Sequence, residues 1–395
     1  MSNIADVVVL GACRTAVGGF GGSLKDTAPA DLAAITLREA VARANVQAEA
    51  VQHVVFGNVI HTEPRDMYVS RVAAVQAGLP VTTPALTLNR LCGSGLQAII
   101  SAAQMIMLGD IDTAAAGGTE NMSRAPYWLP GARWGMRMGD GPVVDAMLSA
   151  ITCPFSDCHM GVTAENVAAR YQITREDQDA LAVESHRRAV NALDKGYFSK
   201  QIVPVPVQRK KETVPFDTDE HVRRELKHAD LQKLRPVFRE EGSVTAGNAS
   251  GINDGAACMI LASAGYAEKH DLKPLARLVG YAHSGVEPDY MGIGPVPAIR
   301  KVLENTNLGV ASMDVIELNE AFAAQALAVV RELDLPEERT NPNGSGIALG
   351  HPIGATGCII SVKALYELQR TQGRYALVSM CIGGGQGIAA IFERV

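Results

Sequence analysis

The sequence predicts an α/β protein built from two similar halves, the first of which is interrupted by a long insertion. Three observations lead to this prediction. Apolar segments of strand length alternate with amphipathic helical segments, as in α/β proteins. The order of these segments and of their glycine-rich turns recurs in the second part of the chain, which indicates an internal duplication. Between the two passes, residues 121–250 form a long polar insertion of the kind that commonly provides a binding lid.

The composition is that of a large folded protein without a strong charge bias. Of the 395 residues, 47% are hydrophobic and 38 are glycine, so the chain can bury a sizeable core. The net charge of −6 argues against nucleic acid or an anionic membrane as the main partner. No apolar run reaches the roughly 18 residues of a spanning helix. The seven scattered cysteines favour reduced thiols, so we expect a soluble, cytoplasmic protein without a secretory signal.

The first half opens with a predicted strand at residues 7–10 and a helix at 30–43, with Pro29 as its start signal. The pattern continues with a strand at 51–57, a helix at 68–77 and a buried small-residue strand at 111–120. Strands that alternate with helices indicate crossover connections, so the sheet is expected to be mainly parallel.

One turn in this half carries a candidate nucleophile. An apolar, extended run over residues 84–91 gives way at Cys92 to a small-residue helix. A thiol at a helix N-terminus lies at the positive end of the helix dipole, which is expected to lower its pKa and favour the reactive thiolate. An isolated buried cysteine is usually inert. The interpretation therefore depends on partner residues elsewhere in the chain.

Two other motifs overlap this turn. Residues 93–98 fit the dinucleotide-binding pattern G-x-G-x-x-A, but they lie far from the N-terminus and no acidic residue clearly ends a following strand. A nicotinamide-dependent oxidoreductase therefore stays open as an alternative. Ser94 does not form a nucleophile elbow, because Cys92 occupies the position of the first glycine in G-x-S-x-G.

After the insertion the alternation resumes and repeats the first half in order. Residues 275–281 and 314–318 match the first two strands, residues 341–357 match the Cys92 turn and its helix, and residues 375–385 match the strand at 111–118. In such a duplicated pair, matching turns can face each other across a pseudo-twofold axis. Cys92 is therefore expected to meet residues of the second copy.

Three turns of the second half carry the expected partners of Cys92. Asn319 follows a strand and opens a helix, His351 lies in a Gly-His-Pro turn, and Cys381 precedes a glycine-rich turn that includes Gly383. A neutral imidazole can take a proton from a thiol, and a second thiol can serve as acid or base. Glycine N–H groups and an asparagine can stabilise an oxyanion. Together these residues predict covalent catalysis by cysteine.

The motifs around these residues resemble those of the thiolases (acetyl-CoA C-acyltransferases) along the whole chain. In family order they are Asn-x-Leu-Cys-Gly-Ser-Gly at 89–95, His-Met-Gly at 159–161, Thr-Ala-Gly-Asn-Ala-Ser at 245–250, Asn-Glu-Ala-Phe at 319–322, Gly-His-Pro at 350–352 and Cys-Ile-Gly-Gly-Gly at 381–385. The chain is most similar to bacterial β-ketothiolases that condense short acyl-CoA units, including those that feed polyhydroxyalkanoate synthesis.

The resemblance implies a duplicated thiolase-type α/β/α/β/α core of two similar halves with an inserted loop domain. The N-terminal half would comprise residues 1–120 and 251–270, and the C-terminal half residues 271–395. Residues 121–250 would form the loop domain that binds coenzyme A and takes part in tetramer contacts. The implied assembly is a homotetramer.

The resemblance also implies a ping-pong reaction. Cys92, activated by His351, would take the acyl group as a thioester while the N–H groups of Cys92 and Gly383 bind the oxyanion. Cys381 would then remove an α-proton from a second acetyl-CoA, with the enolate held by His351 and by a water on Asn319. Attack on the acyl-Cys92 gives a 3-ketoacyl-CoA, and thiolysis by coenzyme A is the reverse. Coenzyme A and acyl-CoA are then substrates, with no permanently bound cofactor and no metal.

The implied coenzyme A contacts lie in and near the insertion. Arg223 would lie against the adenine and Ser250 against the pantetheine. Cys153 and Cys158 lack the spacing of a zinc site and are interpreted as incidental thiols. The remaining residues would border or lie near the thioester pocket: His159, Met160, Phe238, Ala246 and Phe322.

Two further alternatives stay open. A ketoacyl synthase that acts on a carrier protein belongs to the same superfamily, but its sites resemble Cys-His-His or Cys-His-Asn, whereas this chain has Cys381. A non-catalytic acyl-CoA or lipid-binding relative would be expected to lack one of Cys92, His351 and Cys381. The direction of the reaction and the chain length stay open too, because one methylene in a pocket is worth only roughly 1–3 kcal/mol.

Overall fold

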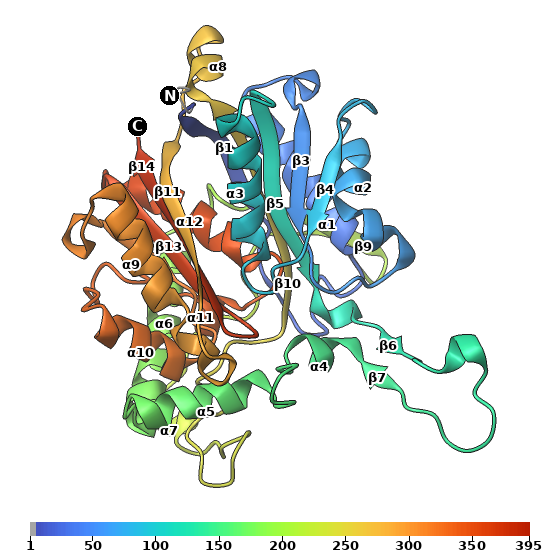
Figure 1. Ribbon diagram of the computed structural model, residues 1–395, viewed down its shortest axis with the longest axis vertical. Helices are drawn as coiled ribbons and strands as arrows, with labels where there is room; N and C mark the ends of the chain where they lie inside the picture. Colours follow the sequence, from blue (N-terminus) through green and yellow to red (C-terminus); the bar gives the residue numbers. More distant parts are fainter. Residues whose placement is uncertain (1–4) are drawn as a thin grey trace.

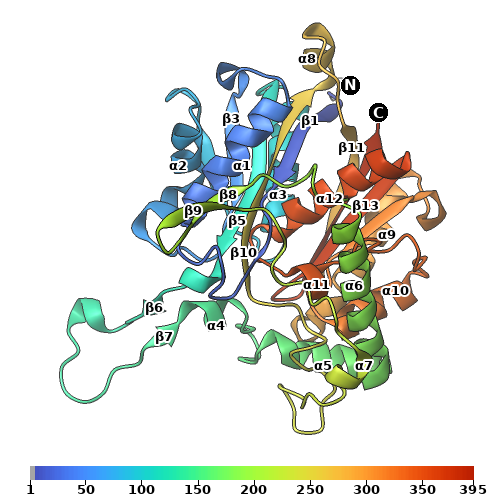
Figure 2. The same cartoon turned by 180° about the vertical axis from the view of Figure 1, so that it is seen from behind.

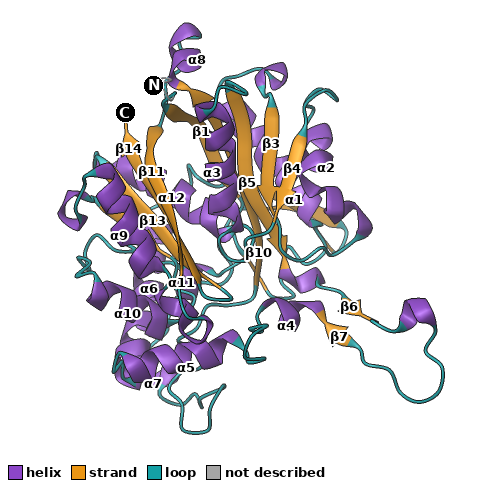
Figure 3. Cartoon of the chain, viewed as in Figure 1, coloured by secondary structure: helices purple, strands orange, loops and turns teal. Residues whose placement is uncertain are grey.

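A ten-stranded β-sheet runs through both halves of the protein and carries helices on its two faces (Figure 1, Figure 3). The computed structural model describes residues 5–395. The strand order is β12-β13-β14-β11-β1-β10-β5-β3-β4, and the short β2 (Gly18–Gly19) pairs with β10. The halves meet where β1 and β11 pair antiparallel through two residue pairs. The strands of the first half are β1 (Val7–Arg14), β3 (His53–Gly57), β4 (Ala85–Leu88), β5 (Thr113–Asn121) and β10 (Asn253–Ser263). Those of the second are β11 (Ala276–Gly285), β12 (Val315–Leu318), β13 (Tyr375–Ile382) and β14 (Gln386–Arg394).

The strand order shows the internal duplication directly. From the junction outwards, β1-β10-β5-β3 in the first half matches β11-β14-β13-β12 in the second. Both β1 and β11 contain a register shift, next to Gly11 and Gly280 respectively. A Cβ on Gly11 would lie 2.5 Å from the Ala44 nitrogen, and one on Gly280 would lie 2.6 Å from Thr306 Cγ2. Each glycine therefore lets the C-terminal end of the first helix of its half approach the sheet closely.

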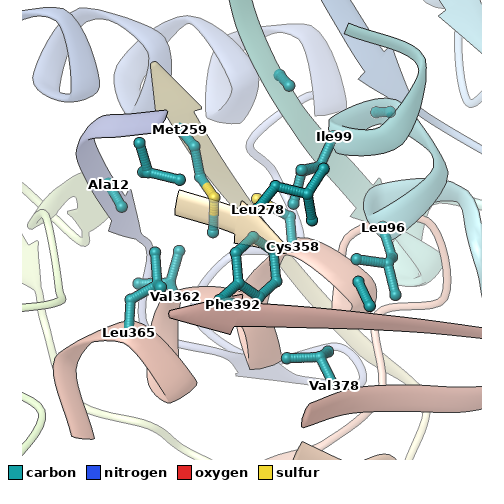
Figure 4. Packing of buried hydrophobic residues seen from close by; sticks show 14 of the residues in the cluster. Ala12, Leu96, Ile99, Met259, Leu278, Cys358, Val362, Leu365, Val378 and Phe392 are labelled. Carbon is teal, nitrogen blue, oxygen red and sulfur yellow. The ribbon is translucent and has the colours of Figure 1, made fainter. Parts of the chain in front are cut away.

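The parts of the sheet that belong to the two halves form two layers, with helices between them and on their outer faces. The core therefore has five layers in the predicted order of helix, sheet, helix, sheet and helix. Two helices, α3 (Ser94–Met107) and α12 (Thr356–Thr371), lie in the centre between the sheet faces of the two halves. Figure 4 shows Ile99 of α3 and Val362 of α12 beside Met259 of β10 and Phe392 of β14. The outer faces are covered by α1 (Pro29–Arg43) and α2 (Val69–Gln76) in the first half, and by α9 (Pro295–Thr306) and α10 (Ala323–Glu332) in the second.

The strand at the junction explains the apolar runs in the sequence. In β1, Val7 and Val9 pack in the central cluster, whereas Val8 and Leu10 pack in the outer cluster with α1 and α2. Side chains alternate between the faces of a strand, so a sheet covered on both sides needs apolar residues at consecutive positions.

The expectation of a mainly parallel sheet was wrong. Within residues 5–395, the parallel pairs of this sheet are β3–β4, β3–β5 and β12–β13, and the other pairings are antiparallel. The difference arises because each half ends in an antiparallel hairpin-like pair. In the second half the glycine turn after Cys381 leads straight back into β14, and in the first half β10 returns beside β5 after the insertion.

Between β5 and β10 the chain forms several helices and short strands outside the layered core (Figure 2). The ion pair between Arg14 of β1 and Asp219 connects this segment to the core; its N–O distance is 2.7 Å and both side chains are fully buried. Among the helices of residues 5–395, none combines the length and apolar character needed to cross a membrane. The elements are β6 (Tyr127–Trp128), β7 (Val144–Asp145), α4 (Ala146–Ala150), α5 (Met160–Arg170), α6 (Arg175–Asp194), β8 (Val205–Arg209), β9 (Glu212–Phe216) and α7 (His228–Leu231).

Candidate active site

Two glycines bring the turns of the two halves together. A Cβ on Gly95 in α3 would lie 2.7 Å from the Cys358 nitrogen of α12, and one on Gly357 would lie 2.4 Å from the Leu96 nitrogen. The N-terminal turns of the two central helices therefore touch backbone to backbone, which side chains at either position would prevent. This contact places the Cys92 turn beside the His351 turn, as the duplicated order predicts.

The Cys92 turn is fixed by side-chain hydrogen bonds from its own residues. Leu91 has a φ of +45°, a left-handed conformation that is uncommon for a residue with a branched side chain. Ser94 holds it: its Oγ accepts from the Arg90 N–H at 2.8 Å and donates to the Leu91 carbonyl at 2.7 Å. Cys92 itself is partly exposed. The nucleophile is thus presented on a constrained turn, in an orientation set before any substrate binds.

The pKa of the Cys92 thiol differs from the expectation, so its protonation state in the free protein differs as well. Burial raises the pKa of the Cys92 thiol to about 11, although the backbone N–H groups of Gly383 and of Cys92 itself act to lower it. The predicted lowering by the helix terminus is therefore outweighed by loss of hydration. At neutral pH Cys92 is a thiol, and a base must take its proton when it attacks. The same two N–H groups face the sulfur and are placed to stabilise an oxyanion next to it.

His351 is the candidate base, because it lines the same cavity as Cys92. It is buried, and burial lowers its pKa to about 4, so the imidazole is neutral at physiological pH. Its Nδ1 lies 2.7 Å from Thr356 Oγ1, and its Nε2 lies 3.4 Å from Asn319 Nδ2. The backbone N–H of His351 donates to Asn253 Oδ1 of β10 at 2.9 Å. The second half therefore holds the imidazole, and the first half holds the backbone that carries it.

Cys381 lies near the end of β13 rather than after it, paired with Gly387 of β14. The turn between these strands has φ values of +81° at Gly384 and +86° at Gly385, which favour glycine. Cys381 is buried, and its burial together with the nearby Cys92 raises the pKa of its thiol well above the usual range. It is thus a protonated group held close to the first thiol.

These groups line a cavity of about 450 Å³. Asn319 lies behind the wall and reaches the site through its contact with His351. His159 caps α5, with its Nδ1 accepting from the Gly161 N–H at 3.0 Å, and its ring stacks on Phe238 at 4.6 Å. The predicted site residues that line the cavity are Cys92, His159, Met160, Arg223, Phe238, Ala246, Ser250, Phe322, His351, Cys381 and Gly383.

Several lining residues were not identified from the sequence. His221 and Met291 line the cavity, together with Leu91, Met122 and Ile353. Met122, Met291 and Ile353 are apolar and lie outside the motifs, so they are indistinguishable in sequence from core residues. Thr356 was also missed, although a hydroxyl in the first turn of the helix after a Gly-His-Pro turn is a usable signal for a histidine partner.

The arrangement suits acyl transfer. A nucleophilic thiol, a neutral imidazole and two backbone N–H groups surround one point, which is the set needed to form and break a thioester. A second thiol can move another proton at the same place. Within residues 5–395, no three or more His, Cys, Asp and Glu side chains come together as a possible metal site.

Comparisons with known proteins agree with this geometry. The thiolase N-terminal domain family matches residues 7–265, and the thiolase C-terminal domain family matches residues 272–394. The beta-ketothiolase BktB of Cupriavidus necator is 64% identical over 391 residues, covering 99% of each chain. The crystal structure of the Bacillus anthracis acetyl-CoA acetyltransferase superposes with a TM-score of 0.98 at 45% identity and covers 100% of both chains. Human mitochondrial 3-ketoacyl-CoA thiolase in complex with CoA gives a TM-score of 0.97 at 44% identity, covering 100% of this chain and 99% of its own. The predicted family is confirmed: this chain belongs to the thiolases.

Proposed function

We propose that this protein is a β-ketothiolase that condenses two short acyl-CoA molecules, or cleaves a 3-ketoacyl-CoA with coenzyme A, through an acyl-Cys92 intermediate. The observation that carries the proposal is the convergence of Cys92, His351 and Cys381 on one cavity. The N–H groups of Cys92 and Gly383 face the sulfur that would carry the acyl group. The names of the similar proteins, a beta-ketothiolase and acetyl-CoA acetyltransferases, support the same chemistry.

In the first half-reaction His351 takes the Cys92 proton as the sulfur attacks the thioester carbonyl. The oxygen becomes an oxyanion held by the N–H groups of Cys92 and Gly383, and one such donor is worth about 2.7–4 kcal/mol. Collapse breaks the bond to coenzyme A, which leaves with the proton returned by His351. The acyl group stays on Cys92.

In the second half-reaction Cys381 passes its proton to Nε2 of His351 and, as a thiolate, takes a proton from the α-carbon of acetyl-CoA. Its high pKa means that the thiol becomes a strong base once it loses its proton, which suits removal of a weakly acidic C–H. His351 and a water on Asn319 would hold the enolate oxygen. The α-carbon attacks the acyl carbonyl, the Cys92 thioester breaks, and a 3-ketoacyl-CoA leaves. The Cys92 sulfur takes the proton back from His351, which restores the starting state.

Coenzyme A would enter along the wall formed by the segment between β5 and β10. Arg223 is exposed and lines the cavity, which suits contact with the adenine nucleotide, and Ser250 would contact the pantetheine. His159, Met160, Phe238, Ala246 and Phe322 would border the thioester end. That the human thiolase was solved with CoA supports a site for this ligand in the shared fold. Residues 121–250 would be the loop domain, inserted into a first half of residues 1–120 and 251–270 and followed by residues 271–395.

We also propose a homotetramer in the cytoplasm. The hairpin of β6 and β7 projects from the body (Figure 1), and residues 127–143 are all exposed. Both tryptophans of the chain lie there, with Trp134 85% exposed and Trp128 51% exposed. An apolar arm of this kind fits burial against another subunit. All seven cysteines, which lie within residues 5–395, are free thiols, as expected in a reducing compartment.

The test is a thiolysis assay with the purified protein, acetoacetyl-CoA and coenzyme A. We expect acetyl-CoA to form with ping-pong kinetics, and the Cys92→Ser variant to be inactive while still binding coenzyme A. Activity with 3-ketohexanoyl-CoA in the same assay measures the chain-length range. A folded wild-type protein that binds acyl-CoA without turnover would instead support a non-catalytic binding protein. Nicotinamide-dependent absorbance changes would support the oxidoreductase alternative.

A further inference from the structure

The second nitrogen of His351 faces a buried hydroxyl. His351 Nδ1 and Thr356 Oγ1 are 2.7 Å apart, and both residues are almost fully buried, at 5% and 2% exposure. Thr356 is the first residue of α12, and its Oγ1 also donates to the Pro352 carbonyl at 2.9 Å. A hydroxyl carries one proton, so while it donates to Pro352 it can only accept from the imidazole.

This arrangement selects one tautomer of the neutral imidazole. Nδ1 carries the proton and donates it to Thr356, so Nε2 is left with its lone pair. The contact on the other side agrees, because the group 3.4 Å from Nε2 is the Nδ2 amide of Asn319, which can only donate. The opposite tautomer would place an Nε2–H against this amide and would require Thr356 to leave the Pro352 carbonyl.

We propose that Thr356 is a positioning residue that keeps Nε2 of His351 free to accept the Cys92 proton. The inference rests on the proposed thiolase function, since it concerns the same proton. When the S–H bond of Cys92 breaks and Nε2–H forms, the imidazolium still donates from Nδ1 to Thr356, and this charge-assisted bond stabilises it. When coenzyme A leaves, Nε2 gives the proton to its sulfur and the original tautomer returns.

Other titratable groups around this pair act in the opposite direction. Cys381 of β13 lies close to Cys92, and Glu120 of β5 opposes the Cys92 thiolate when it is ionised, although burial raises the pKa of Glu120 to about 8. The Gly383 and Cys92 N–H groups favour the thiolate, but they cannot take its proton. The hydroxyl beneath His351 is therefore the contact through which the imidazole is prepared for that step.

The test compares three substitutions in α12. Thr356→Val keeps the shape and removes the acceptor, Thr356→Ser keeps the acceptor, and Ser361→Ala is the matched control. Ser361 is buried in the same helix and makes the same kind of bond, donating to the Gly357 carbonyl at 2.7 Å, but it does not touch a catalytic group. We expect Thr356→Val to lower kcat on the order of 10- to 100-fold with little change in KM, the range seen when the second nitrogen of a metal-bound histidine loses its partner. Thr356→Ser and Ser361→Ala should stay close to wild type.

A second readout separates positioning from a general structural role. Iodoacetamide alkylation of Cys92 at pH 7 depends on proton removal by His351, so Thr356→Val should slow it by a factor similar to that on kcat. As the pH approaches the thiol pKa, solvent removes the proton and the difference should vanish. If Thr356→Val does not fold, the same measurements on Thr356→Ala decide whether Thr356 positions His351. Equal alkylation profiles in an active wild type and either variant would overturn the inference and leave the proposed function intact. An inactive wild type would overturn the proposed function itself.

Discussion

The two halves carry different side chains at equivalent strand ends, and these side chains make different contacts. In the first half, Gly57 of β3 pairs with Gly118 of β5; in the second, Leu318 of β12 pairs with Ser379 of β13 at the same sequence separation. Glu120 lies two residues beyond Gly118 of β5, and Cys381 lies two residues beyond Ser379 of β13. Asn58 and Asn319 each lie one residue beyond the other member of the pair.

In the first half this position is filled with hydrogen bonds. The Glu120 carboxylate accepts from Asn58 Nδ2 at 3.1 Å, from the Val59 and Ile60 N–H groups at 3.1 and 3.0 Å, and from the Gly354 N–H at 2.8 Å. Gly354 belongs to the turn that carries His351. The first half thus uses its copy of the position to hold the catalytic turn of the second.

In the second half the same position is left open toward a cavity. Cys381 lines it, and Asn319 contacts His351 rather than a carboxylate. One copy of the position is therefore a buried hydrogen-bonded support, and the other lies at the cavity where we propose that the reaction occurs. The comparison predicts that changes at Cys381 and Asn319 affect rates, whereas changes at Glu120 and Asn58 affect stability.

The largest effect is expected for Cys381→Ala. Removal of a general acid–base group typically costs about 10²- to 10⁴-fold in rate, and we expect condensation to fall within or below that range. Transfer of an acetyl group from acetyl-CoA to Cys92 should persist, because it does not use the α-proton. Rates of condensation and of hydrogen exchange at the acetyl methyl group, measured on the same sample, check this. Retained exchange would contradict the role of Cys381.

Asn319→Ala and Asn58→Ala form a matched pair. Loss of one oxyanion donor costs about 10²- to 10³-fold in kcat, so Asn319→Ala should be slow but as stable as wild type. Asn58→Ala should keep most of its activity and lose about 1–3 kcal/mol of unfolding free energy, because buried partners lose their donor. Steady-state rates and denaturant unfolding of both variants measure the contrast. Similar behaviour of the two variants would remove the distinction between the halves.

Glu120→Gln tests the supporting position. An amide group can accept at one atom only, so two of the four N–H donors would face another donor. We expect a fall in unfolding free energy of about 1–3 kcal/mol for each unpaired group, measured by thermal or denaturant unfolding. The fall in kcat should be smaller than for Cys381→Ala, since only the placement of the His351 turn changes.

An effect that is small near neutral pH is a loss of the stability that buried neutral histidines contribute in mild acid. Burial lowers the pKa of His351, His186 and His221 to about 4 in the folded protein, against 6.5 when unfolded. Between these values each of the three histidines binds more protons in the unfolded chain, so its contribution to stability should fall as the pH drops from 6.5 to 4, by at most about 1.4 kcal/mol per pH unit. Buried carboxyls such as Glu120, whose pKa burial raises to about 8, act in the opposite direction. The contribution of one histidine is therefore measured as the difference in unfolding free energy between wild type and His186→Gln, which keeps an acceptor for the Arg223 N–H, and this difference should shrink toward pH 4.

The turns of the candidate site could be predicted because their motifs recur in the same order in the two halves. The order of Cys92, Asn319, His351 and Cys381 along the repeat was enough to place them together. The strand directions were not predictable in the same way, because a repeat fixes the order of elements but not how its last strand returns. The glycines after Cys381 were interpreted as oxyanion donors, and their second role as a hairpin turn was missed.

Two features of the site depend on contacts that are distant in the sequence. The helix-terminus argument for Cys92 used its immediate neighbours, whereas the burial that raises its pKa involves residues distant in the sequence; Cys92 packs against a cluster that contains Ile60, Met122 and Ile353. The tautomer of His351 depends on a hydroxyl and an amide from two different elements. Such effects follow from tertiary packing and have no periodic signal in the sequence.

The most direct test of a site shared between the two halves is peptide mapping by mass spectrometry after incubation with acetoacetyl-CoA. We predict an acetyl group on the peptide that contains Cys92, lost when coenzyme A is added and absent in Cys92→Ser. An acetyl group on Cys381 instead, or no adduct on a folded protein, would contradict the assignment of the nucleophile to the first half and of the proton-transfer thiol to the second.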